Sequence, residues 1–132
     1  MHGGQGSQNG FDNSGKRGQI HFQDDDNAKE AVYVLGQMAL LLKSWIDEGS
    51  IKAETIYGME LLNEPAAAWT PDLWEVIRDY FNYAGHDQIR QVFPAEMSNL
   101  SVVVQTAFKS YNDYDDYMQG SVSKLFKKHY SK

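Results

Sequence analysis

The stretch TIYGMELLNEP, residues 55 to 65, runs from a series of apolar side chains straight into Asn-Glu-Pro. Residues 55 to 62 are apolar on both alternating faces apart from Glu60, which predicts a parallel strand covered by helices on one side and by a packed interior on the other. In parallel α/β folds the reacting groups lie past the carboxyl ends of the strands. Asn63 and Glu64 stand at that point, and the sequence therefore makes them candidates for a functional site.

Position alone leaves a second interpretation of Glu64 open, that of a solvated loop residue before a helix. Pro65 restricts the residue in front of it, so we expect Glu64 to have an extended backbone and a steady side-chain direction. Such rigidity suits a catalytic acid, but it suits any turn as well.

The flanking segments predict helices and strands in alternation. Residues 27 to 47 repeat apolar side chains at steps of three and four after an Asn-Glu capping pair, which indicates an amphipathic helix. A Thr-Pro pair predicts a second helix over residues 71 to 93, with a bend or break near Gly85. Residues 100 to 108 form a β-branched run typical of a buried strand. Strands joined by crossover helices predict an α/β fold with parallel strands.

The composition excludes several classes of protein and site. The 132 residues carry a net charge of −6 at pH 7, which argues against nucleic acid or an anionic membrane as partner, because both require clustered Lys and Arg. No cysteine is present, so disulfides and thiolate metal sites are excluded. We expect no transmembrane helix, no secretory signal peptide, no metal and no other cofactor. His21, His86 and His129 have no partner at ligand spacing, and we expect them at the surface.

The two ends of the chain differ from its centre. Residues 1 to 26 are polar and rich in glycine, and they predict a long loop, because such a stretch buries too little apolar surface to fold alone. Residues 119 to 132 have no predicted place in the fold. The lysines in this tail are more typical of a solvated end than of a binding patch.

Two motifs together resemble a known family. HGGQGSQNGFDNSG, residues 2 to 15, and GMELLNEP, residues 58 to 65, are similar to two motifs of the exo-β-1,3-glucanase branch of glycoside hydrolase family 5, and they stand in the same order. That branch usually has Ala and Pro at the positions of Gly4 and Gln5. Two motifs in the correct order are much more specific than either one alone.

A third segment extends the resemblance. VVVQTAFKSYNDYDDYM, residues 102 to 118, resembles the fifth strand of that branch and the segment after it, although Gln105 and Thr106 stand where His and Asp are common. The resemblance implies one domain over residues 1 to 132, a partial TIM (β/α)8 barrel that covers roughly strands 3 to 5. Residues 1 to 26 would be its active-site loop region.

The resemblance also implies an activity and the residues that carry it. A member of this branch is an extracellular or cell-wall glycosidase that hydrolyses β-1,3-glucan, or oligosaccharides of it, with retention of configuration. Glu64 matches the acid/base, Asn63 matches the residue that bonds the sugar 2-hydroxyl, and His2 matches an active-site histidine on the third strand. The loop that lines the glucose-binding pocket is matched by Phe11, Asp12 and Asn13.

Retaining hydrolysis also needs a second carboxyl group about 5 to 5.5 Å from the acid. Glu60 lies four residues away along a strand, roughly 13 Å, and we expect it to satisfy polar groups inside the barrel instead. No residue of this chain is assigned as the nucleophile, which the family has at the end of its seventh strand. A complete barrel takes about 250 residues, so we expect the chain to be inactive without a complementing piece. The alternative is a non-catalytic glucan-binding or assembly remnant.

Overall fold

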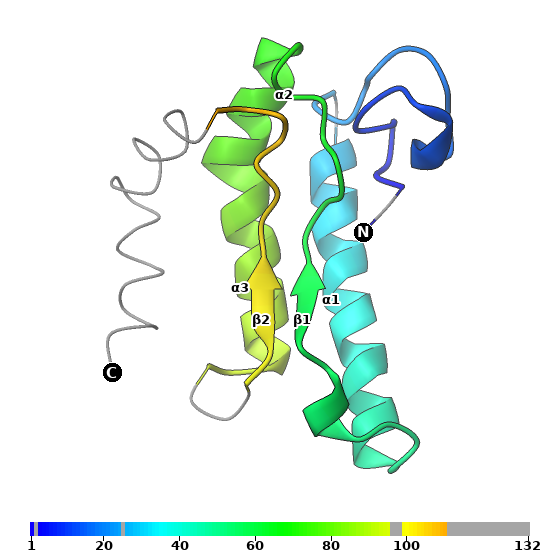
Figure 1. Cartoon of the computed structure of the whole chain (residues 1–132), viewed down its shortest axis with the longest axis vertical. Helices are drawn as coiled ribbons and strands as arrows, with labels where there is room; N and C mark the ends of the chain where they lie inside the picture. The colour runs from blue at the N-terminus through cyan, green and yellow to red at the C-terminus, as the bar shows by residue number, and fades with distance from the viewer. Residues whose placement is uncertain (2, 25, 96–98, 111–132) are drawn as a thin grey trace.

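Two parallel strands lie at the centre of the structure. The computed structural model describes residues 1, 3–24, 26–95 and 99–110. β1 (Gly58–Glu60) pairs in parallel with β2 (Ser101–Val103), and Gly58 lies opposite Ser101 (Figure 1). The parallel order predicted from the sequence is confirmed. Both strands are shorter than predicted, because Ala53–Thr55 form a 3-10 turn (η2) before β1 and the backbone leaves regular pairing after Glu60.

The helices begin and end close to the predicted residues. α1 spans Asn27–Asp47, as its periodicity predicts. The second helical stretch is continuous and has three parts, which are α2 (Pro71–Val76), the π-helical segment η3 (Ile77–Phe81) and α3 (Asn82–Val92). The break predicted near Gly85 is wrong, since Gly85 lies inside α3 and the irregularity is η3.

Gly85 has a packing role instead. A Cβ added there would lie 3.0 Å from Cδ1 of Leu35 on α1 and 3.3 Å from Cδ2 of Leu61 after β1. The missing side chain therefore lets α1 and α3 approach each other and the sheet closely.

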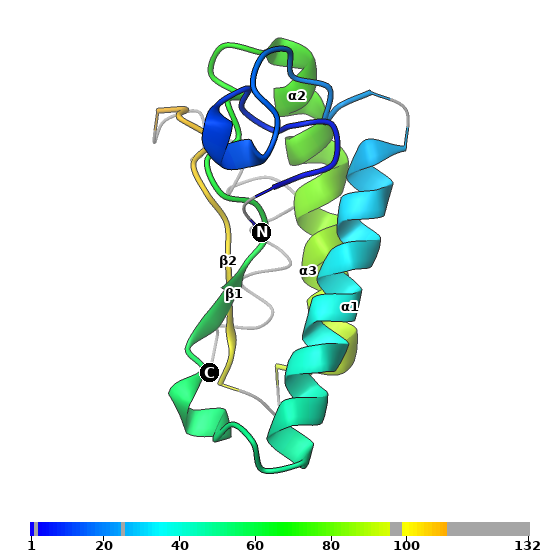
Figure 2. The ribbon, with the colours of Figure 1, turned by 90° about the vertical axis from the view of Figure 1, so that its right-hand side faces the viewer.

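Both long helices cover the same side of the two strands (Figure 2). The core between these layers contains Leu35, Leu61 and Ile89, all fully or almost fully buried. The rings of Phe22 and Phe81 meet edge to face with centroids 5.2 Å apart, which joins the N-terminal segment to η3. His86 is also buried, only 7% exposed, so the prediction that it lies at the surface is wrong.

Part of the N-terminal segment packs against the carboxyl end of β1 and the turn after it, whereas residues 11–13 and 15–19 are exposed (Figure 1). It contains one 3-10 turn, η1 (Asp12–Ser14), and three polar side chains that are almost fully buried, those of Ser7, Gln8 and Asn9. These residues are buried because they pack against the end of β1, although the segment itself contains few apolar side chains.

Helices and parallel strands give the described part of the chain the predicted α/β character. None of its described helices is both long enough and apolar enough to cross a membrane. The tail predicted over residues 119 to 132 lies outside the described residues, as does His129.

Candidate active site

The site is built where the N-terminal segment meets the end of β1. The Met1 amino group donates to the Glu60 carbonyl over 3.0 Å, and the Asn63 N–H donates to the Met1 carbonyl over 2.8 Å. Burial lowers the pKa of the Met1 amino group, and the nearby Glu60 charge partly opposes that effect. The backbone around Met1 therefore lies alongside the turn that carries Asn63.

Gln8 ties the same turn from the other side. Its Nε2 donates to the Asn63 carbonyl over 3.1 Å, and its own carbonyl accepts the N–H of Ala66 over 3.0 Å. Its Oε1 accepts the N–H of Gly4 over 2.9 Å, so the fully buried side chain is held at both ends. One residue thus fixes the backbone on both sides of Glu64.

Short polar contacts shape the loop that carries the sugar-pocket motif. The hydroxyls of Ser7 and Ser14 lie 2.6 Å apart in the interior of the loop. Asn9 accepts the N–H of Phe11 over 2.8 Å and donates through Nδ2 to Oδ1 of Asn13 over 3.2 Å. Because the Asn13 oxygen takes this bond, its Nδ2 group points to the other side.

The two motifs meet through Asn13 and Glu64. Nδ2 of Asn13 donates to Oε2 of Glu64 over 3.0 Å, although the two residues are 51 positions apart in sequence. Glu64 is partly exposed, so one carboxylate oxygen is oriented by the loop while the group stays accessible. This contact distinguishes Glu64 from a solvated loop residue without a partner.

The backbone of Glu64 differs from the expectation. Its φ is +48°, in the left-handed region, and not the extended conformation that Pro65 was expected to favour. A non-glycine residue in this region costs of order 1 kcal/mol or more and persists only where its surroundings hold it. The bonds from Met1 and Gln8 to the backbone on either side of Glu64 supply that restraint.

Asn63 belongs to a second polar chain, which crosses from β1 to the segment after β2. Nε2 of Gln105 donates to Oε1 of Glu60 over 2.6 Å and to Oδ1 of Asn63 over 3.4 Å. Glu60 thus bonds a polar neighbour from the segment after β2, and its predicted place inside a barrel stays a prediction.

Two more of the predicted residues, Phe11 and Asp12, lie in the same loop as Asn13. Phe11 is 50% exposed, and Asp12 is exposed with the Arg17 guanidinium 3.9 Å from its carboxylate. Neither carries a contact to Glu64 comparable with that of Asn13. His2 lies outside the described residues, so its match to the family histidine stays a prediction.

Two aromatic residues that no sequence pattern singled out, Trp69 and Phe108, lie in the loops after the strands. The rings of Trp69 and Phe108 have centroids 5.0 Å apart, and their side chains are 66% and 44% exposed. The N–H of Ala68 donates to the carbonyl of Ala107 over 3.2 Å and joins the two loops that carry them. The sequence does show that Trp69 follows one predicted strand and that Phe108 ends the other. It does not show that the two strands are neighbours, and without that the two rings could not be recognised as a pair.

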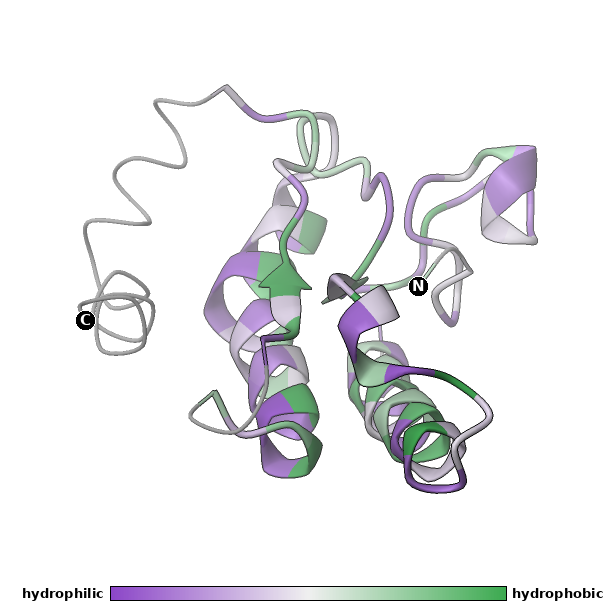
Figure 3. Ribbon diagram, turned by 60° about the horizontal axis from the view of Figure 1, so that its bottom comes forward, coloured by the Kyte–Doolittle hydropathy of each residue, from purple (hydrophilic) through white to green (hydrophobic). Residues whose placement is uncertain are grey.

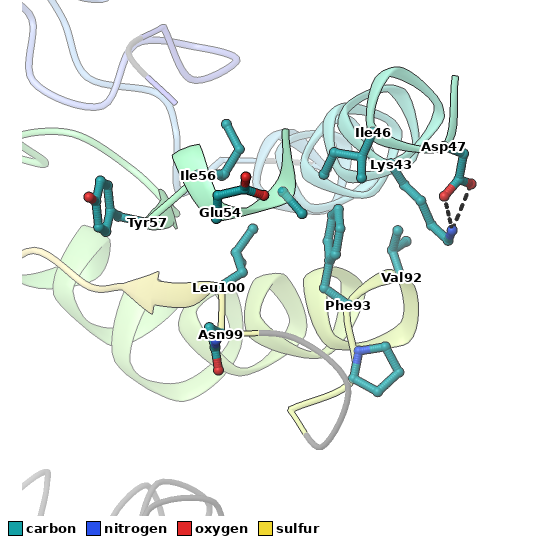
Figure 4. A pocket seen from close by; sticks show the side chains of 12 residues that line it. Lys43, Ile46, Asp47, Glu54, Ile56, Tyr57, Val92, Phe93, Asn99 and Leu100 are labelled. Carbon is teal, nitrogen blue, oxygen red and sulfur yellow. Dashed lines mark hydrogen bonds and ion pairs between the residues drawn. The ribbon is translucent and has the colours of Figure 1, made fainter. Parts of the chain in front are cut away.

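A large cavity lies elsewhere, at the amino ends of the strands. It has a volume of about 600 Å³ and is bounded mainly by apolar residues between the end of α1, η2 and the end of α3, such as Ile46, Ile56 and Phe93 (Figure 4). Its charged lining includes the ion pair of Lys43 with Asp47. Because sites of parallel folds lie at the opposite ends of strands, we place the candidate site at Glu64 and not in this cavity.

Comparison with known proteins supports the resemblance drawn from the motifs. The chain is 37% identical over 123 residues to a glucan 1,3-beta-glucosidase of Candida oleophila, a match that covers 92% of this chain and 27% of the relative. It is 35% identical over 118 residues to glucan 1,3-beta-glucosidase I/II of Saccharomyces cerevisiae, covering 89% of this chain and 24% of the relative.

A third relative covers almost the whole chain. The glucan 1,3-beta-glucosidase of Kluyveromyces lactis is 34% identical over 133 aligned positions, which cover 98% of this chain and 28% of the relative. No protein-family model matches the chain. The chain spans about a quarter of the length of the curated relatives it matches. These matches support the resemblance that the motifs indicate: over about nine-tenths of its length the chain is similar to glucan 1,3-beta-glucosidases.

Proposed function

We propose that this chain carries the acid/base residue and part of the sugar-binding surface of a retaining glucan exo-1,3-β-glucosidase, within a (β/α)8 barrel to which it contributes a part. The observation that carries the proposal is the bond from Asn13 to Glu64, because it joins the two family motifs in one place. The relatives bear the name of this activity. An extracellular or cell-wall location is part of the same proposal.

Glu64 would act twice in the reaction. As an acid it gives a proton to the glycosidic oxygen while the sugar is transferred to the nucleophile, and as a base it then takes a proton from the incoming water. The Asn13 amide holds one carboxylate oxygen of Glu64. The other oxygen then has a defined direction, in which it would face the substrate. A fixed orientation shortens the search for the reactive geometry.

The other site residues would bind the sugar. Asn63 would bond the 2-hydroxyl, a contact that strengthens as positive charge develops at the anomeric carbon. Phe11 presents half of its surface to solvent and can pack on the apolar face of a sugar ring. His2 and Asp12 keep the pocket roles that the resemblance implies.

The nucleophile would come from another stretch of polypeptide. Glu60 is engaged with Gln105 over 2.6 Å and stands on the strand before the turn, which does not suit a group that must attack the same sugar as Glu64. We therefore propose that the chain by itself does not hydrolyse glucan and that a complementing barrel piece completes the site.

The test is glucose release from laminarin by the chain alone and by the chain mixed with the remaining part of the Candida oleophila relative. We expect activity only in the mixture. Glu64→Gln removes the transferable proton and should lower kcat/KM by at least 100-fold, a typical contribution of a general acid. Glu75→Gln, at an exposed position in α2, is the matched control and should leave the rate unchanged.

The alternative, a glucan-binding or assembly remnant, predicts a different result. The chain would then bind laminarin without turnover in either preparation, and Phe11→Ala would weaken that binding. Hydrolysis that survives Glu64→Gln would refute the role proposed for Glu64.

A further inference from the structure

Gln105 lies between two groups that belong to different parts of the site. Its Nε2 is 2.6 Å from Oε1 of Glu60 and 3.4 Å from Oδ1 of Asn63, and all three side chains are partly buried. The side chain comes from the segment directly after β2, whereas the other two come from the end of β1 and the turn after it.

The chemistry of these groups fixes the direction of each bond. An ionised carboxylate only accepts hydrogen bonds, so Glu60 requires the NH2 end of the Gln105 amide to face it. That NH2 group has a second N–H, which is directed at Asn63, and Asn63 must present its oxygen to receive it. The Nδ2 group of Asn63 is thereby turned away from Gln105.

We infer that Gln105 is a positioning residue that, anchored by Glu60, selects the amide orientation in which Asn63 donates through Nδ2 to the sugar 2-hydroxyl. The short bond to the carboxylate is charge-assisted and is the stronger of the two, so it sets the Gln105 amide. The longer bond to Asn63 then favours one of two amide orientations that are almost identical in shape. This inference rests on the proposed function, since it concerns the same sugar contact.

Placing the oxygen of Asn63 toward the 2-hydroxyl would replace a donor with an acceptor. A donor at this place pairs with the hydroxyl oxygen, whereas an acceptor pairs with the hydroxyl proton, so the two amide orientations bind the 2-hydroxyl differently. Loss of Gln105 should therefore affect reactions of substrates that carry a 2-hydroxyl and spare substrates that lack it. A general loosening of the site would affect both kinds of substrate equally.

The experiment compares Gln105→Leu and Gln105→Glu with the unchanged chain, each mixed with the remaining part of the Candida oleophila relative. The substrates are 4-nitrophenyl β-glucoside and its 2-deoxy counterpart. We expect either substitution to lower kcat/KM about 10-fold on the glucoside, the size of one lost hydrogen bond, and less than 2-fold on the 2-deoxy substrate. Gln91→Leu, at an exposed position of α3, is the control and should change neither rate.

Equal losses on both substrates, or no loss on either, would overturn the inference about Gln105. The proposed function is tested separately by Glu64→Gln.

A second measurement needs no activity. In the isolated ¹⁵N-labelled chain, the Asn63 side-chain amide should give one pair of resonances, and Gln105→Leu should give two pairs or exchange-broadened ones as the amide samples both orientations. A single unshifted pair in the variant would also overturn it.

Discussion

At the scale of single residues, Gly4 shows how the loop accommodates a departure from its family's motif. A Cβ added at Gly4 would lie 2.7 Å from two ring carbons of Phe22, which is fully buried. Phe22 in turn meets Phe81 edge to face. An alanine at position 4, which the family motif usually has, would therefore overlap the buried ring of Phe22.

We predict that Gly4→Ala destabilises the chain by about 1 to 3 kcal/mol, the usual cost of overpacking a filled site. The free energy of unfolding from urea titration measures it. Gly3→Ala is the matched control, because a Cβ there would lie 3.5 Å from the nearest atom, in ordinary contact. Phe22→Leu in the Gly4→Ala background should recover part of the loss, and additive effects of the two changes would contradict this account.

Residue identities were predicted well where a motif supplies them and poorly where the backbone conformation decides. The motif identified Glu64 and Asn13, and the structure joins them by a hydrogen bond. The positive φ of Glu64 could not be predicted, because it results from bonds made by Met1 and Gln8, and the local rule for a residue before proline gave the opposite answer.

At the scale of elements, the contact between α1 and α3 depends on a residue that sequence analysis took for a helix break. Gly85→Val would place methyl groups against Leu35 and Leu61, whose atoms lie 3.0 and 3.3 Å from the position of an added Cβ. We predict a loss of about 1 to 3 kcal/mol in unfolding free energy. Gln91→Val, at an exposed site on the same helix, should change it by less than about 1 kcal/mol.

A loss from Gly85→Val no larger than that from Gln91→Val would contradict this account, because replacing glycine by valine by itself gains helix propensity. The elements themselves were predictable to different degrees. The periodicity of α1 gave both its ends, because amphipathic spacing is a local signal. The predicted Asn-Glu capping pair is wrong: the N-cap is Asp26, without a side-chain cap bond, and Asn27 instead donates through Nδ2 to the His21 carbonyl. The π-helical segment Ile77–Phe81 has no local signal of this kind; it ends at Phe81, whose ring packs against Phe22 from a segment distant in sequence.

At the scale of the whole molecule, α1 has apolar side chains on two sides. One side packs against α3, and the other carries a stripe at steps of four, three and four residues, with Val34 40%, Met38 43%, Leu41 49% and Trp45 42% exposed. Hydrophobic colour extends around much of this helix in Figure 3. A second exposed apolar group, Val103, lies on β2. Such surfaces are typical of interfaces.

We therefore predict that the isolated chain self-associates, with the stripe on α1 as the main contact, because burial of about 100 Å² of apolar surface is worth roughly 2.5 kcal/mol. Sedimentation velocity at several concentrations should show an average mass that rises with concentration. We expect the replacement of Met38, Leu41 and Trp45 with Gln, which keeps helix propensity, to raise the protein concentration at which association begins by at least 10-fold. Val103→Lys on β2 is the comparison, since unpaired strands also bind further copies of a chain. If Val103→Lys abolishes association and the α1 variant does not, β2 and not the stripe on α1 is the contact.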